Sequence, residues 1–206
     1  MEKGAENYLD NNGIKVILLG NSGVGKTSII NVATGGKFDM NENVTLSASY
    51  AMKKIRVNKQ DYILNIWDTT GQEKLRELTK IFYSNSKIVI FVYDITSKES
   101  FTELDVWLKD IEEKLGTNFV KGVVANKTDL FLDEIVKNEE GEEYATSIGA
   151  KFLEFSAKKE NPLKFEKFLV DLLLEYFKES TGEILGGRIS LTKKSLLEGK
   201  QRKNCC

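Results

Sequence analysis

Residues 20–27 read G-N-S-G-V-G-K-T and directly follow the apolar run 15–19. The pattern G-x-x-x-x-G-K-[ST] between a buried strand and a helix is typical of a phosphate-binding loop, and this context disfavours a glycine-rich turn without a ligand. Glycines let backbone N–H groups turn toward phosphate oxygens, and the helix N-terminus adds partial positive charge. We expect Lys26 to reach the β- and γ-phosphates and the Thr27 hydroxyl to ligate Mg²⁺. The residues expected to contact the nucleotide here are Ser22, Gly23, Val24, Gly25, Lys26, Thr27 and Ser28.

A second motif, Asn126-Lys127-Thr128-Asp129, follows the apolar run 120–125. The two carboxylate oxygens of Asp129 match the N1–H and 2-amino donors of guanine. Adenine lacks this donor pair and would leave a buried carboxylate unpaired, which costs several kcal/mol. We expect the Asn126 amide to tie this segment to the phosphate loop (residues 20–27), and the Lys127 stem to lie along the base. The motif therefore predicts a guanine nucleotide.

Five separated segments now stand in order along the chain: 20–27, Thr45, Asp68-Thr69-Thr70-Gly71-Gln72, 126–129 and Ser156-Ala157-Lys158. As an ordered set over residues 13–178, they resemble a Ras-superfamily small GTPase, and within it a Rab. The resemblance implies a single P-loop GTPase domain that binds and hydrolyses GTP with Mg²⁺. It also implies a membrane-anchored molecular switch in intracellular vesicle trafficking.

Phosphoryl transfer to water depends on positioning and charge neutralisation. Asp68 ends an expected strand, where its carboxylate is placed to hold the Mg²⁺ shell through water. The Gly71 N–H is expected to donate to the γ-phosphate, because the missing Cβ permits close approach. Gln72 is expected to orient the attacking water as the catalytic residue.

On chemistry alone Thr45, Ser47 or Ser49 is able to ligate Mg²⁺. The resemblance selects Thr45, because Phe38 falls where the family places an aromatic that contacts guanine. Through the loop Ser156-Ala157-Lys158, the resemblance implies that backbone groups, chiefly at Ala157, donate to the guanine carbonyl.

Composition limits the alternatives. The 206 residues suit one α/β domain with a tail. A formal net charge of −1 provides no basic field for nucleic acid, and the lack of histidine removes Ser-His-Asp and Cys-His machinery. The two cysteines are adjacent and terminal, so no disulfide framework is expected. The polar opening 1–12 does not resemble a signal peptide, and we expect a cytosolic body.

Strands are expected at 14–19, 49–57, 62–67, 88–93, 120–125 and 151–155, with a hairpin turn at 58–61. Helices are expected after the phosphate loop and at 97–115, 133–148 and 162–177, the last capped by Asn161 with Pro162 in its first position. Alternating strands and helices predict an α/β fold, a six-stranded and mostly parallel sheet flanked by helices. Residues 1–12 and 179–206 are expected to be a flexible N-terminus and a hypervariable tail.

Three features favour a Rab within the superfamily. Tyr50, Trp67 and Tyr83 fall where Rabs place three aromatics between the switches, and residues 91–96 resemble a Rab segment. The terminal pair Cys205 and Cys206 resembles a Rab double-prenylation site. The resemblance implies a guanine-nucleotide exchange factor, a GTPase-activating protein, a GDP-dissociation inhibitor, Rab escort protein and switch-loop effectors. It implies residence on the cytoplasmic face of an intracellular membrane, with cycling through the cytosol.

Several positions depart from the family pattern: Glu42, Leu46, Ser47, Thr70, Lys74 and Leu75. Thr70 replaces an alanine and adds a hydroxyl beside the γ-phosphate, which puts the rate of hydrolysis in question. A guanine-nucleotide-dependent scaffold with negligible turnover is therefore the main alternative. A metabolic ATP kinase also fits the phosphate loop but leaves residues 126–129 unexplained.

Overall fold

The computed structural model describes residues 13–40, 45, 48–72 and 76–185. Its six strands are β1 (Ile14–Leu19), β2 (Ser49–Val57), β3 (Gln60–Asp68), β4 (Ile88–Asp94), β5 (Val120–Asn126) and β6 (Lys151–Glu154). They form one sheet in the order β2-β3-β1-β4-β5-β6. β2 runs antiparallel to β3 and the other pairs are parallel, as the sequence predicts. The phosphate loop and residues 126–129 consequently leave the sheet at the carboxyl ends of β1 and β5, where α/β folds bind ligands.

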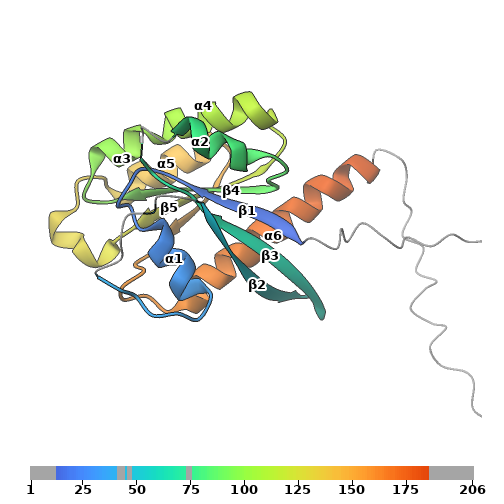
Figure 1. Ribbon diagram of the computed structural model, residues 1–206, viewed down its shortest axis with the longest axis horizontal. Helices are drawn as coiled ribbons and strands as arrows, with labels where there is room; N and C mark the ends of the chain where they lie inside the picture. Colours follow the sequence, from blue (N-terminus) through green and yellow to red (C-terminus); the bar gives the residue numbers. More distant parts are fainter. Residues whose placement is uncertain (1–12, 41–44, 46–47, 73–75, 186–206) are drawn as a thin grey trace, which may run out of the picture.

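Helices cover both faces of the sheet (Figure 1). One face carries α1 (Lys26–Ala33) and α6 (Pro162–Leu185). The other carries α3 (Lys98–Thr102), α4 (Leu104–Leu115) and α5 (Asn138–Ser147). Three short helical segments complete the described chain: α2 (Arg76–Thr79), η2 (Lys80–Tyr83) and η3 (Thr128–Asp133).

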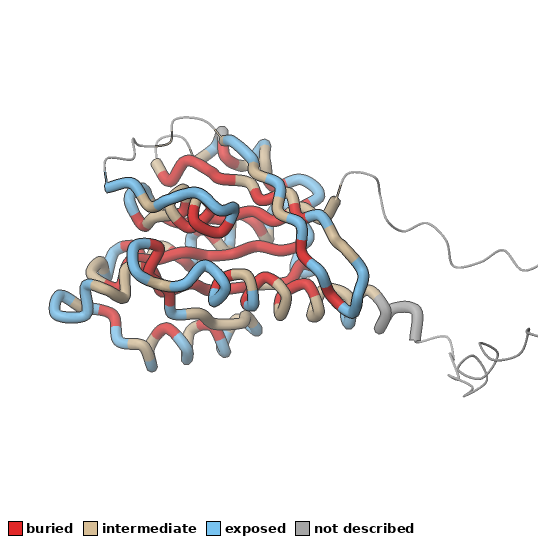
Figure 2. The backbone as a smooth tube through the Cα atoms, turned by 90° about the horizontal axis from the view of Figure 1, so that it is seen from below, coloured by how far each residue is buried: buried red, intermediate tan, exposed pale blue. Residues whose placement is uncertain are grey.

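Side chains of the two central strands, β1 and β4, contribute to the hydrophobic core on each face of the sheet. Val16 and Leu18 of β1 pack toward α1 and α6, whereas Ile17 and Leu19 pack toward α4. β4 alternates in the same way, and all seven of its residues are buried. Figure 2 shows these buried strands crossing the middle of the molecule, with exposed loops around them. Because a strand covered on both faces is apolar throughout, its sequence reads as a continuous apolar run.

A predicted hairpin turn and a predicted helix start are both present. The turn is shorter than the predicted 58–61, because Gln60 and Asp61 already pair with β2, and it consists of Asn58 and Lys59 with φ of 51° and 69°. Such turns match the twist of the flanking strands. At the start of α6, Asn161 Oδ1 accepts a hydrogen bond from the Leu163 N–H at 3.0 Å, as an N-cap does.

Three helix boundaries differ from the prediction. The helix expected at 97–115 is divided at Glu103 into α3 and α4. The helix expected from 133 begins at Asn138, because the N–H groups of Ile135 and Val136 both donate to Ile95 O and hold that segment against the end of β4. α6 continues past Phe177 to Leu185, so part of the predicted tail is helical. The prediction ended the helix at the last residue of its apolar repeat, Phe177, but backbone hydrogen bonds extend α6 beyond that residue.

Candidate nucleotide site

The phosphate loop joins β1 to α1 with three glycines in conformations that L-residues rarely adopt. The φ angles of Gly20, Gly23 and Gly25 are 146°, 78° and 96°. A Cβ at Gly20 would strike the Val92 carbonyl, and one at Gly25 would strike the Asn126 side-chain amide. The loop is therefore held close to β4 and to the base motif by the absence of side chains.

Lys26 lies inside this loop with its side chain almost fully buried. Its Nζ donates hydrogen bonds to Gly20 O at 2.8 Å and Asn21 O at 3.0 Å. Burial lowers the pKa of Lys26 to about 8, against the opposing attraction of Asp68. An ammonium group has three donors, so one N–H remains to reach a phosphate.

The three predicted Mg²⁺ residues meet at one point, although they come from three segments. Thr27 Oγ1 donates to Asp68 Oδ2 at 2.7 Å and lies 2.9 Å from Thr45 Oγ1. Two hydroxyls and one carboxylate form an all-oxygen donor set, which fits Mg²⁺. Among the described residues no cluster of three or more carboxylate, thiol or imidazole side chains gathers.

The segment after β3 contacts the phosphate loop through its backbone. A Cβ at Gly71 would strike the backbone of Asn21 and Ser22, so only glycine allows this approach. Thr70, the unusual residue, is buried, and its Oγ1 accepts a hydrogen bond from the Gln72 N–H at 3.3 Å. Gly71 lines the cavity described below, but Gln72 does not.

The base motif is connected to both neighbouring loops. Asn126 Nδ2 donates to Val24 O at 2.7 Å, which confirms the predicted tie to the phosphate loop. Asn126 Oδ1 accepts from the Ala157 N–H at 3.3 Å. The Ser156 hydroxyl donates to Asp129 Oδ1 at 2.6 Å and fixes that carboxylate. One buried amide thus joins three loops that lie far apart in sequence.

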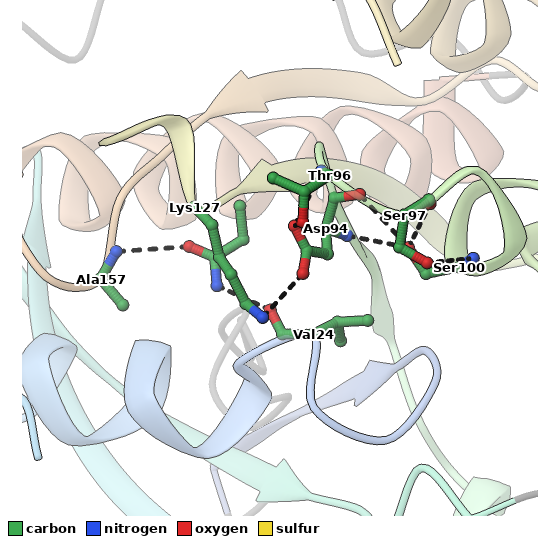
Figure 3. Close-up of polar contacts among 8 residues, drawn as sticks. Val24, Asp94, Thr96, Ser97, Ser100, Lys127 and Ala157 are labelled. Atoms are coloured by element: carbon green, nitrogen blue, oxygen red, sulfur yellow. Dashed lines mark hydrogen bonds and ion pairs between the residues drawn. The ribbon is translucent and has the colours of Figure 1, made fainter. Parts of the chain in front are cut away.

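Asp94, at the end of β4, is a residue that the motifs did not identify. Its Oδ2 binds Lys127 Nζ at 2.7 Å, and its Oδ1 accepts from the Thr96 N–H and hydroxyl at 2.9 and 2.8 Å. Figure 3 shows Asp94 between Lys127 and Thr96. Lys127 has a φ of 66°, which is strained for a residue with a side chain. Its ion pair with Asp94 holds it in this conformation at the border of the cavity. The one sequence signal available for Asp94 is that it lies within the Rab-like segment 91–96, which assigns it no role.

These groups surround a cavity of about 380 Å³, within the range of small-molecule sites. The predicted nucleotide residues that line it are Ser22, Gly23, Gly25, Lys26, Thr27, Ser28, Phe38, Thr45, Gly71, Asn126, Lys127, Asp129, Ala157 and Lys158. Val24 and Ser156 do not line it and act through the two hydrogen bonds given above. Asp39, Met40, Thr69 and Leu130 also border it.

The prediction for the aromatic cluster is wrong in one member. Tyr50 stacks on Trp67 with ring centroids 5.4 Å apart, and the third ring against Trp67 is Phe82, at 5.6 Å. Tyr83 is fully buried in the core beneath α4. Consecutive residues on a tight helical turn point in different directions, so Phe82 faces β3 while its neighbour faces inward.

Comparison with known proteins agrees with this geometry. The Ras family model matches residues 15–174. The chain belongs to the Ras family and, within it, to the Rabs. It is 34% identical to human Ras-related protein Rab-30 over 176 aligned residues, which are 85% of this chain and 86% of that protein. It is 39% identical to bovine Ras-related protein Rab-21 over 158 aligned residues, which are 77% of this chain and 70% of that protein.

This Rab-family chain is a guanine-nucleotide-binding GTPase with the family's role in membrane trafficking and its general dependence on regulators and effectors. Across the part of the chain that the structure describes, no helix combines the length and apolarity needed to cross a bilayer. The predictions for Glu42, Leu46, Ser47, Lys74, Leu75, Cys205 and Cys206 fall outside the described residues.

Proposed function

We propose that this chain binds GTP and GDP together with Mg²⁺ in the cavity between the phosphate loop and residues 126–129. Asp129 would pair with the N1–H and 2-amino groups of guanine. The Ala157 N–H, which donates a weak 3.3 Å hydrogen bond to Asn126 Oδ1, would turn to the guanine carbonyl. Lys26 would contact the β- and γ-phosphates. The support comes from the cavity's lining and from the Ser156 hydrogen bond that orients Asp129.

The hydrogen-bonded group Thr45–Thr27–Asp68 carries the proposal for the metal. Mg²⁺ supplies charge neutralisation at the β- and γ-phosphates. Thr27 and Thr45 would offer hydroxyl ligands, and Asp68 would orient a coordinated water. Because Thr45 belongs to the loop after α1, its participation couples that loop to the nucleotide, as γ-phosphate contacts do in GTPase switches.

In the same proposal Gly71 donates its N–H to the γ-phosphate and Gln72 orients the attacking water. The contact of Gly71 with the phosphate-loop backbone supports the first role. Hydrolysis would release both Thr45 and Gly71, so the loops 38–50 and 69–83 would change conformation together. Effectors would read the Tyr50–Trp67–Phe82 surface between them.

Single-turnover hydrolysis of GTP by the purified chain tests this function. The expected result is slow conversion to GDP that requires Mg²⁺ and is accelerated by a GTPase-activating protein. A second candidate is a nucleotide-dependent scaffold with negligible turnover. It is favoured by the hydrogen bond from the Gln72 N–H to the Thr70 hydroxyl, because this bond holds the backbone of the residue that would orient the water. Tight GTP binding without measurable conversion, with or without an activating protein, would select that scaffold.

We further propose that Cys205 and Cys206 are both prenylated, with delivery by Rab escort protein and extraction by a GDP-dissociation inhibitor. One lipid chain binds membranes only reversibly, so stable anchoring takes two signals. Arg188, Lys193, Lys194, Lys200, Arg202 and Lys203 against Glu198 add attraction to anionic cytosolic leaflets. An exchange factor and an activating protein would complete the cycle.

A further inference from the structure

A short apolar surface follows the base motif on η3. Leu130, Phe131, Leu132 and Ile135 are 38%, 66%, 87% and 58% exposed. We call these four residues the η3 patch. Runs of three consecutive exposed apolar residues weaken solubility and are avoided unless they serve an interaction.

Backbone hydrogen bonds at both ends of η3 keep these side chains exposed. The Leu130 N–H donates to Lys127 O at 2.8 Å, and the N–H groups of Ile135 and Val136 donate to Ile95 O at 2.9 and 3.0 Å. Val136 fills the inward position and is fully buried. The turn is therefore fixed at both ends, and its apolar side chains remain outside because the core position is already taken.

Acidic residues follow the η3 patch along the chain, and we call them the acidic rim. Asp133 is the last residue of η3, Glu134 follows it, and Glu139, Glu142 and Glu143 lie on α5. The one basic residue between 128 and 147 is Lys137, and it pairs with Glu134 at 2.9 Å. Acidic side chains next to exposed apolar ones repel anionic bilayers and attract segments that place Lys or Arg beside apolar side chains.

Leu130 borders the nucleotide cavity, but the patch lies away from the switch surface formed by Tyr50 and Trp67. η3 follows β5, whereas Tyr50 and Trp67 lie on β2 and β3, with β1 and β4 between them in the sheet. In Figures 1 and 2 the η3 turn lies at one end of the molecule and the end of α6 at the other. A partner on η3 therefore leaves the switch surface accessible.

We propose that the η3 patch is a docking surface for a basic amphipathic helix of a partner protein, bound equally in both nucleotide states. An amphipathic helix presents apolar anchors at i, i+3, i+4 and i+7 to an apolar surface, and flanking cations would complement the acidic rim. A second copy of this chain fits poorly, because it would present the same acidic rim. The basic residues of 186–206 are assigned to an anionic membrane in the proposed function, and a truncated chain below tests this segment as the alternative occupant.

The test uses the full chain loaded with GDP or with a non-hydrolysable GTP analogue. The probe is a fluorescent helical peptide of leucine and lysine with leucines at i, i+3, i+4 and i+7, followed by anisotropy. A matched peptide with glutamate in place of lysine is the charge control. We expect micromolar binding of the lysine peptide, equal in both nucleotide states and at least tenfold weaker for the glutamate peptide.

The deciding variant is Phe131→Ser/Leu132→Ser, which should weaken lysine-peptide binding at least tenfold. Its matched control is Leu163→Ser, at a residue 63% exposed at the start of α6, which should change binding less than twofold. Thermal unfolding and affinity for fluorescent GDP should be unchanged in both. Lys substitutions at Asp133 and Glu139 should also weaken binding and flatten its salt dependence.

Four outcomes would overturn the proposal. The first is equal peptide binding by the wild-type chain and the Phe131→Ser/Leu132→Ser variant. The second is a chain ending at Leu185 that binds the peptide tenfold more tightly, which would identify the tail as the occupant. The third is a concentration-dependent dimer in sedimentation that the double variant abolishes. The fourth is flotation with phosphatidylserine vesicles that requires Phe131 and Leu132.

Discussion

The indole Nε1 of Trp107 donates a hydrogen bond to Asn21 Oδ1 at 2.9 Å, across 86 positions of sequence. The other side of this contact is Arg76 in α2, whose guanidinium lies 4.6 Å from the Trp107 ring centroid. Arg76 also binds Glu103 Oε2 at 2.7 Å. The phosphate loop, α4 and the segment 69–83 therefore meet at one buried indole.

This contact predicts a spectroscopic signal. The chain has two tryptophans, so in a Trp67→Phe variant Trp107 reports alone. Exchange of GDP for a non-hydrolysable GTP analogue should shift its emission, because Arg76 moves with the switch while Asn21 stays in the phosphate loop. Trp107→Phe removes the N–H donor and also shrinks a fully buried side chain, so it should cost about 2–3 kcal/mol in urea unfolding. An emission spectrum unaffected by nucleotide would show that α2 does not report the bound state.

Asp129→Asn tests recognition of the base. Loss of charge-assisted hydrogen bonds should weaken GTP binding by at least about 2–3 kcal/mol, and the new amide should favour xanthosine triphosphate, which has a carbonyl at the 2-position. Competition between the two nucleotides measures the change. Ser156→Ala, which leaves the carboxylate but removes its 2.6 Å partner, should weaken GTP less and leave the preference for guanine. Unchanged GTP affinity in Asp129→Asn would refute the assignment.

Thr70 and Gln72 can be separated by single-turnover hydrolysis. Gln72→Leu should slow conversion of GTP without weakening its binding, because the phosphate contacts remain. Thr70→Ala releases the Gln72 N–H from its 3.3 Å hydrogen bond, and we expect hydrolysis to rise about two- to fivefold, the size of one weak hydrogen bond. Thr70→Ser retains the hydroxyl and should behave as wild type. If serine accelerates hydrolysis as alanine does, the hydroxyl is not the cause.

The lowered pKa of Lys26 predicts that the protein takes up a proton when it binds nucleotide. Burial lowers its pKa from the ordinary value of 10.5 to about 8, and a phosphate anion favours the charged form, so binding of GDP should raise that pKa again. At pH 8 the nucleotide-free protein should take up close to half a proton on binding GDP. At pH 6.5 Lys26 is already charged and should contribute none. Calorimetry in buffers of different ionisation enthalpy measures the uptake, and Lys26→Arg, charged at both pH values, should show none.

The membrane proposal predicts that Cys205→Ser/Cys206→Ser leaves nucleotide affinity unchanged and moves the chain to the cytosol. A single substitution should give partial, reversible membrane binding, since one lipid anchors weakly. Fractionation of cells that express the fluorescent full-length chain measures both. A double variant that stays on membranes would place the anchor elsewhere in the chain.

The sequence alone predicts the structure correctly where a local pattern is compatible with one conformation. The apolar run of β1, the position of the phosphate loop between that strand and a helix, and the Asn161–Pro162 helix start are of this kind, and each is predicted at the correct residues. The tie from Asn126 to Val24 was predictable because both motifs had to leave parallel strands at the same edge of the sheet.

The sequence was insufficient where long-range packing decides. Phe82 and Tyr83 are adjacent aromatics, and only the orientation of η2 shows which of them faces Trp67. Asp94 belongs to no short motif and gains its role from Lys127, 33 positions away in the chain but adjacent in the fold. The late start of α5 depends on a hydrogen bond to Ile95, which no periodicity encodes.

The alternating side chains of β1 and β4 have a consequence for cooperativity. Because each strand contributes to the packing on both sides of the sheet, neither helical layer is able to melt while the other keeps its full complement of contacts. Partial opening is then confined to the periphery, and the strand that delivers the phosphate loop opens only when the whole domain does. We therefore expect the amide hydrogens of β1 and β4 to exchange more slowly than those of the loops that move at the edge of the sheet.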